Sequence, residues 1–252
     1  MTISIAVAGK GGSGKTTIAA LIIRYLVNSG SGPIMAVDAD PNSNLAESLG
    51  LEVNETIGSI IAGFNEDKIN IPPGMTKENY LEYRLNQAVV ESHNIDLIAM
   101  GRGEGPDCYC YPNTLLRKFI DSLADNYSYI VMDNEAGMEH LSRRTTRNVD
   151  DLIVVSNHSV KGLRAVDQIA ELTNQLKLGV KRRSVLINNA PAEISPLVKD
   201  EMARLKITPS AVIPSDDSVY QYDLALKPLL DLPENSAAVR EVSNFMIGLK
   251  GR

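Results

Sequence analysis

One stretch near the N-terminus has the residue types and spacing of a phosphate cradle. It reads Gly9, Lys10, Gly11, Gly12, Ser13, Gly14, Lys15, Thr16, Thr17, which matches the pattern G-x-x-x-x-G-K-[ST]. The glycines let backbone N–H groups turn toward phosphate oxygens, and a helix that starts here adds partial positive charge. Lys15 supplies a cation for the β- and γ-phosphates, and Thr16 supplies a hydroxyl ligand for Mg²⁺. The motif therefore predicts binding of a nucleoside triphosphate.

The same glycines also fit a rival pattern. Gly9, Gly11 and Gly14 satisfy the G-x-G-x-x-G of dinucleotide folds, and Asp38 stands where such a fold places its ribose-binding acid. Lys15 and the threonine that follows it decide between the two patterns, because a dinucleotide site has no use for this pair. We therefore predict a phosphate loop.

Carboxylates follow two apolar runs that we predict to be strands. Asp133 follows the run at 129–132 and is the expected acid on the magnesium side of the site. Gly137 is free to bring its N–H close to the γ-phosphate. Asp38 and Asp40 follow the second strand, where one could hold a magnesium-bound water and the other could orient the attacking water. From the pattern alone, a solvated turn explains these two aspartates nearly as well.

The only two cysteines of the chain, Cys108 and Cys110, lie two positions apart in a turn-rich stretch. Two thiolates supply half of a four-ligand metal site, and a two-fold dimer would complete a four-sulfur site on its axis. A structural pair of buried residues and a redox-active dithiol are the other interpretations. The thiolates do not select the ion, because zinc, nickel and an iron–sulfur cluster all accept sulfur ligands.

Short apolar runs alternate with amphipathic stretches along the whole chain. We predict strands at 3–8, 34–37, 97–100, 129–132, 152–155, 185–187 and 211–213, and helices at 15–28, 113–125, 160–176, 196–205 and 237–249. The alternation predicts an α/β fold, in which a doubly wound, mainly parallel sheet carries helices on both faces. We expect one domain over residues 1–252. Residues 50–87 break the rhythm, and their polarity predicts a surface excursion.

Composition excludes several other classes of protein. The 252 residues include 25 Lys and Arg and 31 Asp and Glu, and the net charge of −6 argues against a nucleic-acid binder. No apolar run approaches the roughly 18 residues of a membrane span. Two cysteines are too few for a disulfide framework. We therefore expect a cytoplasmic protein with neither nucleic acid nor membrane as a partner.

The phosphate loop resembles the deviant Walker A motif of the MinD/ParA/nitrogenase-iron-protein class of dimeric ATPases. In that class a second lysine early in the loop, here Lys10, reaches the nucleotide of the partner chain. The resemblance implies that Asp40 positions the attacking water and that Asp38 and Asp133 lie at the Mg²⁺ site with Thr16. It also implies that Asn188 reads adenine and that Pro214, Ser215 and Asp216 form the loop around adenine and ribose. ATP and ADP are the nucleotides it implies.

A narrower resemblance rests on the cysteine pair and on residues 135–141, Glu-Ala-Gly-Met-Glu-His-Leu. Together they are similar to the CooC-type nickel-insertion ATPases, which serve carbon monoxide dehydrogenase and the linked acetyl-CoA synthase. This resemblance implies a homodimer that depends on nucleotide and metal, with Ni²⁺, or Zn²⁺ as the alternative, between Cys108 and Cys110 of both chains. The partner would be one of those two apo-enzymes. A ParA- or MinD-like spatial organiser and an iron–sulfur carrier are the competing functions.

Overall fold

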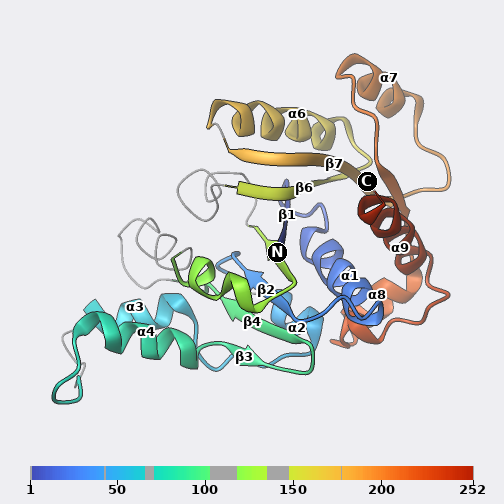
Figure 1. Ribbon diagram of the computed structural model, residues 1–252. Helices are drawn as coiled ribbons and strands as arrows, with labels where there is room; N and C mark the ends of the chain where they lie inside the picture. Colours follow the sequence, from blue (N-terminus) through green and yellow to red (C-terminus); the bar gives the residue numbers. More distant parts are fainter. Residues whose placement is uncertain are drawn as a thin grey trace.

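The computed structural model describes residues 2–42, 44–65, 71–102, 118–134, 148–176 and 178–251. These residues form an eight-stranded sheet in the order β3-β4-β2-β5-β1-β6-β7-β8 (Figure 1). The strands are β1 (Ile3–Gly9), β2 (Ile34–Asp38), β3 (Val90–Glu91), β4 (Ile95–Ala99), β5 (Tyr129–Asp133), β6 (Asn148–Asn157), β7 (Gly179–Ala190) and β8 (Ala211–Pro214). Every pairing is parallel except that of β3 with β4. The predicted fold class is confirmed.

Helices cover both faces of the sheet, as the alternating pattern requires. They are α1 (Lys15–Asn28), α2 (Leu45–Leu49), α3 (Ile57–Asn65), α4 (Lys77–Gln87), α6 (Val160–Gln175), α7 (Pro196–Arg204), α8 (Asp217–Leu224) and α9 (Ala237–Lys250). On one face α1, α2 and α9 bury a large apolar cluster against the strands. On the other face α3, α4 and α6 bury a second cluster. Residues 118–123 are helical, and the rest of the helix predicted at 113–125 lies partly outside the described residues.

The surface excursion predicted at 50–87 contains two helices that were not predicted from the sequence, and each has a buried side. Its helices α3 and α4 bury Ile57, Ile60, Leu81 and Leu85 in the second apolar cluster. The buried residues of each helix recur three or four positions apart, which is helical spacing, but in α4 charged neighbours dilute the signal. Strand β3 and helix α8 were not predicted either. Within the described part of the chain, no helix is long and apolar enough to cross a membrane.

The carboxyl ends of the parallel strands lie at one edge of the sheet, because parallel strands end together. The phosphate loop lies at the same edge. β1 runs into the loop, and its neighbours β5 and β6 end beside it. β2 pairs with β5 on the other side, so that Asp38 and Asp133 are register partners. The topology therefore gathers the predicted acids around the start of α1.

Candidate functional site

Two glycines of the phosphate loop have positive φ angles and close neighbours that disfavour any side chain. At Gly9, where φ is +157°, an added Cβ would lie 2.2 Å from the carbonyl oxygen of Val155. At Gly14, where φ is +87°, it would lie 2.1 Å from the Nδ2 atom of Asn188. Helix α1 begins at Lys15 with no side-chain cap. Its first N–H groups are thus directed at whatever the loop holds, which is the arrangement that binds phosphate.

Asn188 fixes the shape of this loop. Its Nδ2 donates to the carbonyl oxygen of Ser13 at 3.0 Å, and the N–H of Ser13 donates to the carbonyl oxygen of Lys10 at 3.1 Å. Lys15 is only 8% exposed, whereas the side chain of Lys10 is exposed. The amide nitrogen of Asn188 therefore holds the loop, in addition to the adenine contact that we predicted.

Thr16, Asp133 and Asp38 meet beneath the loop. The hydroxyl of Thr16 donates to Oδ2 of Asp133 at 2.6 Å. The second oxygen of Asp133 is buried and has no hydrogen-bond partner among the residues that the structure describes. Asp38 is fully buried, and its two oxygens accept the N–H groups of Asp40 at 3.2 Å and Leu45 at 2.9 Å. The structure thus brings Thr16 next to Asp133, and Asp133 next to Asp38, and their role at Mg²⁺ stays a prediction.

Burial makes both carboxylates hard to ionise in the absence of a cation. It raises the pKa of Asp38 to about 7, and the nearby charge of Asp133 adds to that effect. It also raises the pKa of Asp133 to about 6, although the hydrogen bond from Thr16 and the charge of Lys15 act the other way. Two such carboxylates and a hydroxyl are oxygen ligands of the kind that Mg²⁺ prefers. The unpartnered oxygen of Asp133 fits a role as one of those ligands.

These shifts predict that the nucleotide-free protein in EDTA loses stability as the pH rises. Folded protein retains protons on Asp38 and Asp133 that the unfolded chain releases near pH 4, so folding is favoured at low pH. That contribution is lost as the pH rises through about 6 to 7. The shift of Asp38 corresponds to at most about 4 kcal/mol.

Thermal unfolding measured from about pH 5 to about pH 8 would test this linkage. Asp38→Asn should remove most of the pH dependence, whereas Asp200→Asn, at an exposed position of α7, should leave it intact. An unfolding temperature that rises with pH over this range in wild-type protein would contradict the prediction.

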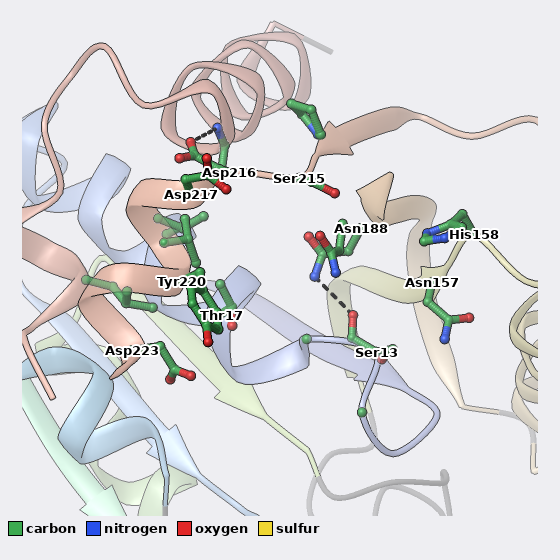
Figure 2. A pocket seen from close by; sticks show the side chains of 18 residues that line it. Ser13, Thr17, Asn157, His158, Asn188, Ser215, Asp216, Asp217, Tyr220 and Asp223 are labelled. Carbon is green, nitrogen blue, oxygen red and sulfur yellow. Dashed lines mark hydrogen bonds between the residues drawn. The ribbon is translucent and has the colours of Figure 1, made fainter. Parts of the chain in front are cut away.

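A cleft of about 530 Å³ extends from the phosphate loop to α8 (Figure 2). Residues of the loop and of α1, the ends of β6, β7 and β8, and helix α8 line it, namely Gly12, Ser13, Gly14, Thr17, Asn157, His158, Asn188, Asn189, Pro214, Ser215, Asp216, Asp217, Tyr220 and Asp223 among others. In Figure 2, Tyr220 and Thr17 lie together on the α8 side, and His158 and Asn157 lie on the opposite side. The volume is in the range of small-molecule sites. Sequence reasoning missed Asn157, Asp217, Tyr220 and Asp223, because no motif marks them.

Asp216 lines the cleft as predicted, but its carboxylate is already engaged. It accepts hydrogen bonds from the N–H of Ser218 at 2.8 Å, the hydroxyl of Ser236 at 2.6 Å and the N–H of Ala238 at 3.0 Å. Burial alone would raise the pKa of Asp216, but these hydrogen bonds outweigh it and hold the pKa below its ordinary value. The side chain therefore ties the loop after β8 to the starts of α8 and α9.

Three predicted site residues, Gly137, Cys108 and Cys110, lie outside the described residues. Among the residues that the structure describes, no group of three or more His, Cys, Asp or Glu side chains could hold a metal ion. The nickel or zinc site stays a prediction.

Comparison with known proteins identifies the family. A family model described as an AAA domain matches residues 1–187. The chain belongs to this AAA domain family. An uncharacterized ATP-binding protein of Methanocaldococcus jannaschii is 42% identical over 243 residues, which cover 96% of each protein. The carbon monoxide dehydrogenase accessory protein CooC of Rhodospirillum rubrum is 29% identical over 96% of this chain and 94% of its own.

Solved structures share the fold of this AAA domain protein. The septum site-determining protein MinD of Pyrococcus horikoshii, in complex with Mg-ADP, aligns with a TM-score of 0.72 at 21% identity, covering 99% of this chain and 96% of its own. A ParA family ATPase of Chlorobium tepidum aligns with a TM-score of 0.75 at 21% identity, covering 98% and 99%. The chain is thus an AAA domain protein with the fold of the MinD and ParA ATPase structures. The fold that the broad resemblance implies is confirmed, and the narrower resemblance to nickel-insertion ATPases stays a prediction.

Proposed function

We propose that this AAA domain protein is a magnesium-dependent enzyme that hydrolyses ATP to ADP and phosphate. The observation that carries the proposal is the contact of Thr16 with the buried, half-unpartnered carboxylate of Asp133, directly below the phosphate loop. A buried carboxylate with a raised pKa is costly unless a cation neutralises it, and this one stands where a P-loop enzyme needs its metal.

Each residue of the proposed site has its own role in hydrolysis. The N–H groups at the start of α1 and Lys15 bind the β- and γ-phosphates and neutralise the charge that develops in the transition state. Thr16, Asp133 and Asp38 would hold Mg²⁺, which when bound supplies further charge neutralisation at those phosphates. Asp40 orients the attacking water. Lys10, whose side chain is exposed, acts on the nucleotide of a partner chain in a homodimer.

Phosphate release by the purified protein tests the proposal. Wild-type protein should release phosphate from ATP in the presence of Mg²⁺, and EDTA should stop this release. Lys10→Ala should lower turnover at least about tenfold, because the dimer loses the cation that neutralises the partner's phosphates. Lys199→Ala, which removes an exposed lysine from α7, is the matched control and should hydrolyse normally. Undiminished turnover of Lys10→Ala would contradict the dimeric mechanism.

We further propose that ATP turnover drives the delivery of a metal ion to a client enzyme. Cys108 and Cys110 of two chains would hold Ni²⁺, with Zn²⁺ as the alternative, and the client would be an apo form of carbon monoxide dehydrogenase or acetyl-CoA synthase. Two findings support this function: the Cys-x-Cys pair, and the similarity to the accessory protein CooC along nearly the full length of both chains.

A spatial organiser is the second candidate, favoured by similarity to the septum site-determining protein MinD of Bacillus subtilis, which is 24% identical over 96% of this chain. Such a protein would sediment with liposomes or plasmid DNA in the presence of ATP. The acidic net charge of −6 opposes binding to DNA.

An iron–sulfur carrier is another competing function. It would show a broad visible absorption band and acid-labile sulfide after anaerobic purification.

A further inference from the structure

Arg102 reaches the segment that carries the proposed water-positioning acid. Both the backbone N–H of Asn42, at 2.9 Å, and its Nδ2, at 3.0 Å, donate to Oδ1 of Asp40. The Oδ1 of Asn42 in turn accepts from Nη2 of Arg102 at 2.7 Å. One side-chain amide therefore connects the guanidinium of Arg102 to the carboxylate of Asp40.

The main chain holds Arg102 in place independently of that contact. β2 and β4 are paired, and beyond their ends the N–H of Met100 donates to the carbonyl oxygen of Asp38 at 2.8 Å. Gly101 then turns with φ at +64°, and an added Cβ would lie 2.3 Å from Oγ1 of Thr56. Only glycine fits a left-handed position packed so closely. The backbone thus presents Arg102 to the segment after β2, although its side chain lies at the surface.

We propose that Arg102 is a positioning residue for ATP hydrolysis, which acts through Asn42 to hold the carboxylate of Asp40. This inference rests on the proposed ATPase function. The phosphate loop binds ATP without Arg102, so loss of the contact should affect the chemical step and spare affinity.

Kinetics of variants test the proposal. Arg102→Ala should lower kcat about five- to tenfold with KM for ATP changed less than about twofold, a split that a general loss of structure would not give. Arg102→Lys should recover much of the rate, since lysine still offers a donor. In the Asn42→Ala background, Arg102→Ala should cause no further loss, because both act on one pathway. Arg183→Ala is the matched control, since Arg183 is an exposed arginine that donates to Asn174 at 3.3 Å.

Amide hydrogen exchange tests the same contact without relying on hydrolysis. Arg102→Ala should speed exchange of the Asn42 amide in ADP-bound protein, and Arg183→Ala should not. Unchanged kcat and unchanged exchange in Arg102→Ala, or additive losses in the double variant, would overturn the inference. Wild-type protein that binds ATP but releases no phosphate would contradict the proposed ATPase function instead, and the exchange rates would still show whether Arg102 holds the segment of Asn42.

Discussion

Replacing Asp40 by alanine should lower ATP turnover at least about tenfold, which is about 1.4 kcal/mol or more of transition-state stabilisation, while ATP still binds. The neighbouring Asp38 cannot take over. It is fully buried, both of its oxygens accept backbone N–H groups, and burial raises its pKa to about 7. Asp40 is only partly buried and projects from the loop after β2, so it is the acid of this pair that can meet water.

The test compares single-turnover and steady-state rates of ATP hydrolysis by three variants with those of wild-type protein. Asp40→Asn keeps an acceptor for Asn42 but removes the negative charge, so it should be nearly as slow as the alanine variant. Asp200→Ala, on the exposed side of α7, should hydrolyse ATP at the wild-type rate. Wild-type turnover by Asp40→Ala would contradict the assigned role.

Replacing Cys108 by alanine should abolish tight metal binding and spare ATP binding. A single remaining cysteine per chain gives a dimer only two thiolates, half of the set that a four-sulfur site requires. The proposed nucleotide site consists of the phosphate loop with Thr16 and Asp133, and it takes no ligand from the cysteines. Thr16→Ala should therefore have the converse effect, with weakened magnesium-nucleotide binding and retained metal.

Equilibrium dialysis against Ni²⁺ and against a fluorescent ATP analogue would measure both affinities for each variant. Stoichiometric metal retained by Cys108→Ala would refute the thiolate site. Loss of both ligands together in both variants would instead indicate unfolding, which circular dichroism of the same samples would reveal.

Residues whose placement follows from strand ends could be predicted from the sequence. A parallel sheet buries its strands on both faces, so β1, β2 and β5 appear as continuous apolar runs. The carboxyl ends of these strands share one edge of the sheet, and the sequence alone therefore predicts that Asp38 and Asp133 lie together there. Thr16 joins them because α1 begins directly after β1 and the phosphate loop. The spacing of glycine and lysine in the phosphate loop is also a local feature of the sequence, so the loop could be predicted as well.

Contacts between side chains distant in sequence could not be predicted. Arg102 and Asn42 are 60 positions apart, and no periodicity relates them. The carboxylate of Asp216 was expected at the ligand, but the starts of α8 and α9 use it for capping. Asn188 was expected to read adenine, which stays a prediction, and its hydrogen bond to the carbonyl oxygen of Ser13 was not foreseen. In each case a polar side chain takes a partner from several groups that could compete for it, and only the folded structure shows which group is near enough.

The most direct test of the proposed metal-delivering ATPase is a nickel titration of reduced, anaerobic, metal-free protein with and without nucleotide. Thiolate charge-transfer absorbance would report binding, and light scattering would report the mass of the complex. We expect one Ni²⁺ per dimer in wild-type protein, and none in Cys110→Ala. Absence of nickel binding in every nucleotide state would contradict the metal-delivery function and leave the spatial organiser as the function to test.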